Sequence, residues 1–312
     1  MTARQEFVHT RIWREEPEAG NPFAARAAFC HGYDVFGEML GKARWVEMLF
    51  LLFRGERPSR GQADLLDALA VALANPGPRD PSVHAAMCAG VGGSTAASSL
   101  IASLAVGAGG QGGAREVFLL MKLFWAPCGA NLTAWRERLA TPLDLPADVW
   151  PATEHVPGFD PYGAYPAESP PPSPAPDEQA SGGTASAFGA LVAVLARLFG
   201  GRKTHRRTLP ARPSGAAVPY TVWQALSALA ARSEGPALRF LATHCVALEQ
   251  AVGRPLSMTN VAAAALSDLS FTPEEGELLY LLLRLPGAGA HALEQWGRGF
   301  RQFPFYPIVE ET

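Results

Sequence analysis

Apolar residues recur at helical spacing between residues 59 and 74. Four leucines in this stretch fall on one face of a helix: Leu65, Leu66, Leu69 and Leu73. Ser59 is a residue type that caps helix N-termini, and Pro76-Gly77 is a pair that stops helices. We therefore predict an amphipathic helix that begins at Ser59 and runs to about Ala74.

Two further helices are predicted toward the C-terminus. Thr272-Pro273-Glu274-Glu275 is a capping box with proline at the first helical position. Residues 276–285 behind it are apolar nearly all round, so we expect a buried helix that ends at Pro286-Gly287. Another helix is expected from 236 to 252, with Gly253 as its stop.

The segment 82–113 is dense in alanine, glycine and serine. Small side chains let helix backbones approach closely, so we expect a central helix tightly surrounded by others. Alternating β-branched runs, which would indicate strands, are almost absent from the chain. The predicted fold class is therefore all-α.

A proline-, glycine- and serine-rich stretch at residues 165–219 interrupts this pattern and is typical of a linker or flexible loop. Within it, residues 187–199 are apolar enough for a short helix, and the basic cluster 202–207 follows. This arrangement suits docking to a membrane surface or an acidic partner. The alternative is a solvated insertion whose helix packs on the body of the protein, and we favour that interpretation.

Composition narrows the classes of protein. The chain has 312 residues, enough for two domains, and a net charge of -3, which makes nucleic acid an unexpected partner. The basic and acidic first residues lack the apolar core of a signal peptide. No uncharged apolar run reaches the length of a transmembrane segment. We therefore expect a cytoplasmic protein.

The four cysteines, Cys30, Cys88, Cys128 and Cys245, are far apart in the sequence. Zinc sites need closely spaced ligands, so we expect no metal site, and we expect buried free thiols instead.

Three stretches, in this order, carry a resemblance to a known family. The first is Gly32-Tyr33-Asp34 with the helix-like run 45–58, and the second leads from Ser82 to Gln111-Gly112-Gly113-Ala114. The third comprises Asn260-Val261, Arg284 and the run Ala290-His291-Ala292-Leu293-Glu294-Gln295. Together they cover about half of the chain, which resembles the citrate synthase family.

The resemblance implies a citrate-synthase-like fold: an almost wholly helical homodimer with an active-site cleft between a large and a small domain. Residues 1–132 and 253–312 would form the large domain, and residues 133–252, with the insertion, the small one. The family forms or breaks a carbon–carbon bond between an acyl-CoA and a keto acid, or cleaves citryl-CoA. The resemblance also implies a CoA thioester as substrate and no tightly bound cofactor.

The family's chemistry needs a base beside the α-carbon of the thioester and a hydrogen-bond donor at its carbonyl oxygen. Where the family has the donor histidine, this chain has Gln111, whose amide can still donate a hydrogen bond. Where the family has the aspartate base, this chain has Ala262. The family's second histidine motif is matched only by Pro157-Gly158-Phe159-Asp160-Pro161. We therefore predict either a changed mechanism or a noncatalytic protein.

Replacement groups lie near the last motif. His155 and Asp160 are candidate bases, although an exposed loop histidine and a turn aspartate are the alternatives. The resemblance makes Arg284 a ligand for a substrate carboxylate, with an ion pair to Glu277 or Glu294 as the structural alternative. Arg115 is expected either to bind substrate or to pair with Glu116.

Three functions are compatible with these residues. The first is an enzyme that acts on an acyl-CoA and a keto acid, or on citryl-CoA. The second is a noncatalytic relative that binds a metabolite or regulates an active family member, which the loss of a carboxylate at Ala262 favours. The third makes the insertion a docking element.

Overall fold

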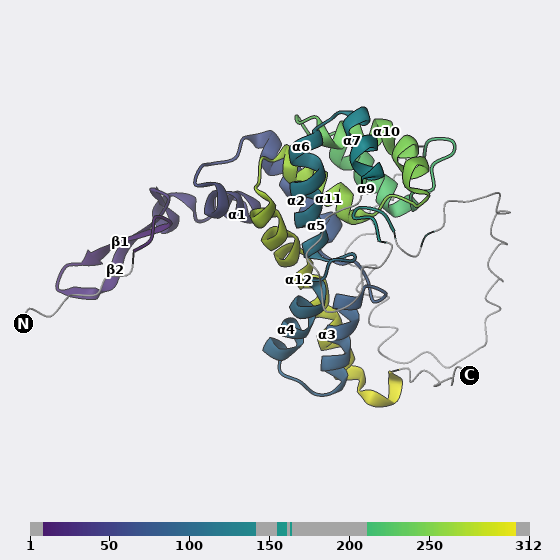
Figure 1. Cartoon of the computed structure of the whole chain (residues 1–312). Coiled ribbons are helices and arrows are strands. Elements are labelled where there is room, and N and C mark those ends of the chain that lie inside the picture. Colours follow the sequence, from purple (N-terminus) through teal and green to yellow (C-terminus); the bar gives the residue numbers. More distant parts are fainter. Residues whose placement is uncertain (1–8, 142–154, 161–162, 164–210, 304–312) are drawn as a thin grey trace, which may run out of the picture.

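The computed structural model describes residues 9–141, 155–160, 163 and 211–303. Figure 1 shows an array of helices from which a small β-sheet projects. The helices are α1 (Trp45–Arg54), α2 (Arg60–Leu73), α3 (Pro81–Val91), α4 (Ala96–Gly107), α5 (Ala114–Leu120), α6 (Ala126–Cys128), α7 (Leu132–Ala140), α9 (Tyr220–Ala230), α10 (Ala237–Val252), α11 (Met258–Asp268) and α12 (Pro273–Arg298). The prediction of an all-α fold is confirmed.

Three predicted helix ends are confirmed by their local geometry. The Ser59 side chain accepts a hydrogen bond from the backbone N–H of Gln62 at the start of α2. Thr272 and Glu275 form the expected capping box at the start of α12. Gly253 ends α10 in the left-handed conformation with φ of 73°, where a residue without Cβ is least strained.

The predicted end of the C-terminal helix at Pro286-Gly287 is wrong, because α12 continues through Pro286 to Arg298. The backbone N–H of Gly287 donates to the carbonyl oxygen of Ala74, 2.7 Å away, at the end of α2. A Cβ at this glycine would lie 2.5 Å from that same oxygen. A tertiary contact therefore supports the helix where the proline disturbs its own hydrogen bonds. The helix is also not buried all round, because Leu278 is 52% exposed.

The small-residue segment forms two helices rather than one central helix. The helices α3 and α4 are separated at Gly92-Gly93, where Gly93 has a φ of 72°. Gly90 of α3 packs against the backbone of Ala292 in α12, where any Cβ would overlap the chain. The expected close approach of backbones is present, but the helix at its centre is α12.

A three-stranded antiparallel sheet, in the order β1-β2-β3, was missed by the sequence analysis. Its strands are β1 (Trp13–Glu18), β2 (Asn21–Cys30) and β3 (Tyr33–Asp34). The strands are rich in alanine and charged residues, which do not produce the alternation of a half-buried strand. Figure 1 shows β1 and β2 projecting away from the helices.

The helices enclose two apolar clusters. The larger one runs from Val46 to Leu283 in sequence and contains the packed rings of Trp125, Trp135 and Phe240. The smaller one joins α3 to the second half of α12 through Val83, Ala86, Met87, Ala288 and Ala292. Figure 1 shows α3, α4 and the end of α12 below the other helices.

Some predictions are not tested by this structure. The apolar stretch 187–199 and the basic cluster 202–207 lie outside the described residues. The proposed domain boundaries at residues 132 and 252 remain predictions. Within the described ranges, no helix combines the length and the apolar character needed to cross a membrane.

Candidate functional site

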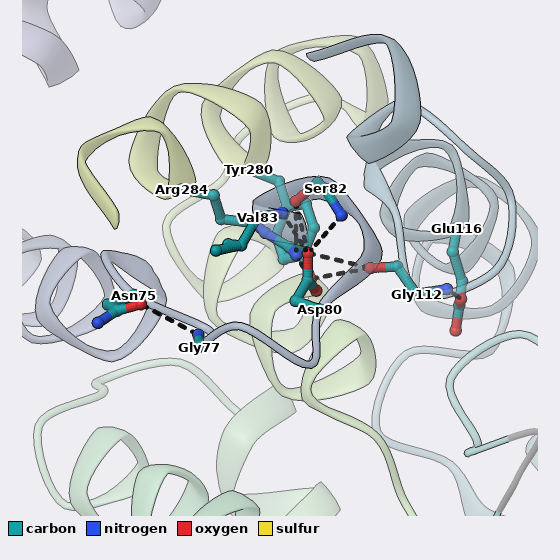
Figure 2. A network of polar contacts seen from close by, with 9 residues as sticks. All are labelled: Asn75, Gly77, Asp80, Ser82, Val83, Gly112, Glu116, Tyr280 and Arg284. Carbon is teal, nitrogen blue, oxygen red and sulfur yellow. Dashed lines mark hydrogen bonds and ion pairs between the residues drawn. The ribbon is translucent and has the colours of Figure 1, made fainter. Parts of the chain in front are cut away.

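The peptide of Gly112 is held on both of its sides. Its N–H donates to a carboxylate oxygen of Glu116, and its carbonyl oxygen accepts from Arg284 Nη1 at 3.0 Å and from the Tyr280 hydroxyl at 3.3 Å. Gly112 has a φ of 72°, a left-handed conformation that favours glycine. The glycine-rich turn before α5 therefore joins two polar clusters, one around Glu116 and one around Arg284 (Figure 2).

Glu116 lies on α5 with only 1% of its surface exposed. Its Oε1 accepts from the backbone N–H of Gly158 and from the Thr259 hydroxyl, both at 2.7 Å. With the bond from Gly112, the carboxylate accepts three hydrogen bonds from three separate segments of the chain. A buried carboxylate needs such donors, because its charge is costly without them.

His155 lies directly beside this carboxylate. Its side chain is 7% exposed, and Nε2 is 3.2 Å from Glu116 Oε2. Both ring nitrogens are buried, and neither has a hydrogen-bond partner among the described residues. The alternative of an exposed loop histidine is therefore wrong. Glu116, expected only as a possible partner of Arg115, lies beside His155 instead.

The segment that carries His155 is fixed against the start of α11. Gly158 has a φ of 89°, and a Cβ there would lie 2.7 Å from Asn260 Nδ2. The carbonyl oxygen of Gly158 accepts from Ser257 N–H at 3.0 Å, and Asp160 N–H donates to Pro255 at 2.8 Å. Asp160 therefore lies at the end of this segment, where its backbone pairs with Pro255. The position of His155 is set by tertiary contacts.

Arg284 is the centre of the second cluster. Its Nη2 pairs with Asp80 Oδ2, and its Nη1 donates a hydrogen bond to the Tyr280 hydroxyl oxygen at 2.5 Å. Although burial alone would lower the pKa of Arg284, Tyr280 and Asp80 raise it above its ordinary value. Burial also raises the pKa of Tyr280 to about 12, so the phenol keeps its proton. The expected structural partners, Glu277 and Glu294, are wrong, and Asp80 takes their place.

Two predicted site residues lie at the edge of these clusters. Arg115 pairs with Glu277 at 3.3 Å, and its guanidinium lies 4.0 Å from the centre of the Phe118 ring. Its side chain is 44% exposed, so it is accessible from solvent. The expected pair between Arg115 and Glu116 is therefore wrong. Gln111 is exposed and directly precedes the clamped peptide of Gly112.

Ala262, where the resemblance places the missing base, is fully buried within α11. Its neighbour Asn260 is also fully buried and accepts from the Trp125 ring N–H at 3.3 Å. The methyl group of Ala262 belongs to the larger apolar cluster. This position therefore contributes packing and offers no proton acceptor.

Two residues of the Arg284 cluster, Asp80 and Tyr280, were not predicted from the sequence. Asp80 precedes Pro81, a position typical of a helix N-cap, and its Oδ1 does accept from Ser82 N–H at 3.0 Å. Tyr280 precedes Arg284 by four residues, the spacing of side chains on one helix face. Both patterns can be recognised in the sequence, but neither shows that Asp80 and Tyr280 both contact Arg284.

His291 and His244 have surroundings that suit a structural role. His291 lies 3.6 Å from Glu294, and the centre of the His244 ring lies 4.8 Å from that of the Phe240 ring. Cys88 is exposed, so the expectation that every thiol is buried is wrong for this residue. The described parts of the chain contain no group of three His, Cys, Asp or Glu side chains placed to hold a metal ion.

Comparisons with known proteins place this geometry in a known fold. No protein-family model matches the sequence, and no curated protein matches it either. Among solved structures, it is similar to citryl-CoA lyase from Hydrogenobacter thermophilus, with a TM-score of 0.59 and 14% sequence identity. That likeness covers 98% of this chain and 97% of the other. The chain therefore has a citrate-synthase-like fold.

Proposed function

We propose that this chain acts on a CoA thioester, making or breaking a carbon–carbon bond to a keto acid by a changed mechanism. The observation that carries the proposal is the buried pair of His155 and Glu116 beside the Gln111-Gly112 turn. The fold, shared with a citryl-CoA lyase, supports the substrate class. Under this proposal the chain works in the cytoplasm and holds no tightly bound cofactor.

The pair has the composition that proton transfer requires. An imidazole is the side chain that most often takes or gives a proton near neutral pH. A carboxylate next to it stabilises the protonated ring. Glu116 is suited to this role, because the three hydrogen bonds that it accepts come from two backbone N–H groups and a hydroxyl. We assign His155 the role of base and Glu116 that of its positioning residue.

Gln111 is the proposed donor to the thioester carbonyl oxygen. Removing the proton from the α-carbon places negative charge on that oxygen, and an amide N–H can stabilise it. The backbone that carries Gln111 is held by the clamped peptide of Gly112. Asp160 is the proposed second carboxylate of the site.

The two arginines are the proposed ligands for the acidic groups of the substrates. Arg115 is half-exposed and therefore available to a carboxylate or a phosphate. Arg284 is buried and already paired with Asp80, so a ligand reaches it only by replacing that pair.

A binding experiment tests the substrate class. We expect CoA or acetyl-CoA, at about a hundred times the dissociation constant, to stabilise the full chain by about 2.7 kcal/mol. Oxaloacetate and citrate are tested in the same series. If no CoA species shifts the melting temperature at millimolar concentration, the substrate class is wrong.

A second candidate is a noncatalytic relative that binds a metabolite or regulates an active family member. The buried methyl group of Ala262 favours it, because the base that the resemblance implies has become part of the core. The test is turnover: ligand stabilisation without any turnover would support this candidate. Co-purification with an active citrate synthase would identify the regulatory form of it.

We also propose that the chain forms a homodimer through α4. The buried positions of this helix are Ser99, Ser103 and Gly107, whereas Ile101 is 63% exposed and Val106 is 45% exposed. The helix has no charged residue. A helix that buries its small polar face and exposes its apolar one is expected to be covered by another surface. The second copy is the proposed cover.

A further inference from the structure

We propose that Asp80 is an intramolecular competitor for the carboxylate of a ligand at Arg284, so that the arginine is masked until a ligand displaces Asp80. This inference rests on the proposed function in one respect, that the ligand is a carboxylic acid. It adds a regulatory contact to the Arg284 cluster, in which Figure 2 shows Asp80 next to Ser82 and Arg284.

The two oxygens of Asp80 have separate roles. Oδ1 accepts from Ser82 N–H at 3.0 Å, from the Ser82 hydroxyl at 2.5 Å and from Val83 N–H at 3.4 Å. These bonds cap α3. Oδ2 is the oxygen that contacts Arg284. The cap and the ion pair therefore depend on different atoms of one side chain.

Not every N–H group of the Arg284 guanidinium has a good hydrogen-bond partner among the described residues. Arg284 Nε is buried and has no hydrogen-bond partner among the described residues, and the bond from Nη2 to the Ser82 hydroxyl is long at 3.4 Å. A carboxylate that binds an arginine with both oxygens engages two of its N–H groups. Because Oδ1 of Asp80 caps α3, Asp80 does not make this bidentate contact with Arg284. A ligand carboxylate has both oxygens free.

The competitor lies on the more exposed side of the pair. The Asp80 side chain is 18% exposed and the Arg284 side chain 8%. Asp80 ends the connection between α2 and α3, in which Gly77 has a φ of 89°. Ala74 and Asn75 at the start of this connection are bound to Gly287 and His291 of α12. Pro78 and Arg79, which directly precede Asp80, are exposed.

Replacing Asp80 by asparagine separates the two roles. Asparagine is as good an N-cap as aspartate, because its carbonyl oxygen can accept the same backbone bonds. Its NH₂ group then stands where Oδ2 was, a donor facing the donors of Arg284. The variant keeps the cap and removes the competing charge. Arg284 is left with a buried charge that lacks a carboxylate partner, which a ligand can supply.

The experiment measures citrate and oxaloacetate binding by calorimetry on the full chain. We expect Asp80→Asn to bind at least one of them about tenfold more tightly than the wild type. The added Arg284→Gln substitution should abolish that gain. Asp64→Asn is the matched control, since it removes a carboxylate from the exposed Arg44 pair at 2.8 Å and should leave binding unchanged. Equal or weaker binding by folded Asp80→Asn would overturn the inference.

If Asp80→Asn is too unstable for calorimetry, its melting temperature is measured with acetate, citrate and sulfate. The carboxylates should raise it by several degrees more than they raise that of the wild type, and sulfate should not reproduce this difference. Equal shifts in both proteins contradict the inference. A wild type that binds acetyl-CoA while Asp80→Asn gains no carboxylate affinity refutes the inference alone. A gain by Asp80→Asn with no CoA binding by the wild type refutes the proposed function alone.

Discussion

Arg284 donates a hydrogen bond to the carbonyl oxygen of Gly112 across 3.0 Å, although 172 residues separate them in sequence. The same peptide donates its N–H to Glu116, which lies beside His155. One peptide group therefore links the ion pair of Asp80 and Arg284 to the proposed proton-transfer pair. A substitution at Gly112 should therefore disturb both the cluster around Glu116 and the cluster around Arg284.

Gly112→Ala should lower the free energy of unfolding by about 1 to 2 kcal/mol, because alanine is strained at a φ of 72°. No atom lies within 4 Å of the added Cβ, so the expected cost is conformational rather than steric. Urea denaturation measures it. Gly297→Ala is the control, since Gly297 lies in α12 with equally open space around it and should gain stability. Equal effects at both positions would show that the turn is not strained.

Glu116→Gln should cost about 2 to 3 kcal/mol of stability, because the new NH₂ group faces buried donors that the carboxylate now satisfies. Glu277→Gln is the matched control at the partly exposed pair with Arg115 and should change stability by less than about 0.5 kcal/mol. Both values come from denaturant titrations. A cost at Glu116 no larger than that at Glu277 would argue against a buried, ionised carboxylate.

Cys88 should react with iodoacetamide in the folded chain at pH 8 well before Cys245. Cys88 is exposed, whereas burial, with Glu249 nearby, raises the pKa of Cys245 to about 12. The thiolate is the reactive form, so a raised pKa slows alkylation. Peptide mass spectrometry follows each site, and unfolding in guanidinium should equalise the two rates. Rapid labelling of native Cys245 would contradict its assigned environment.

The same thiol predicts a dependence of stability on pH. Cys245 keeps its proton up to a pKa of about 12 when folded, whereas its ordinary value is 9.0. Between these values the unfolded chain binds fewer protons, so stability should fall as the pH rises from about 9 toward 12. Cys245→Ala should reduce that slope. An unchanged slope in the variant would show that other groups produce the dependence.

Ile101→Glu should convert a dimer into a monomer without unfolding the chain, because the side chain is 63% exposed on α4. Light scattering after size exclusion measures the mass. Val71→Glu is the matched control, since this residue of α2 is apolar and 75% exposed. A monomeric wild type at micromolar concentration would refute the proposed interface.

Sequence patterns predicted the features of this fold that depend on neighbouring residues. Ser59, Thr272 and Gly253 determine helix ends through atoms a few residues away, so their roles were visible. The continuation of α12 past Pro286 depends on the carbonyl oxygen of Ala74, which lies far away in sequence. The sheet was missed because its strands lack β-branched alternation.

The sequence predicted several residues of the candidate site, but it did not predict which side chains they contact. His155 and Arg284 were both identified, yet the partners named for Arg284 and Arg115 were wrong. Glu116 meets His155 only because α5 and the segment 155–160 converge in the fold. Such pairs join distant parts of the chain, and one sequence contains no direct information about them.

Turnover is the most direct test of the proposed chemistry. Release of CoA from acetyl-CoA with oxaloacetate, and cleavage of citryl-CoA, are followed with the wild type, His155→Ala and the control His244→Ala, whose ring packs on Phe240. We expect turnover by the wild type and by His244→Ala, and a loss of at least about a hundredfold in His155→Ala. Turnover that is unchanged by His155→Ala, or no turnover of either substrate by the wild type, would contradict the assignment of His155 as the base.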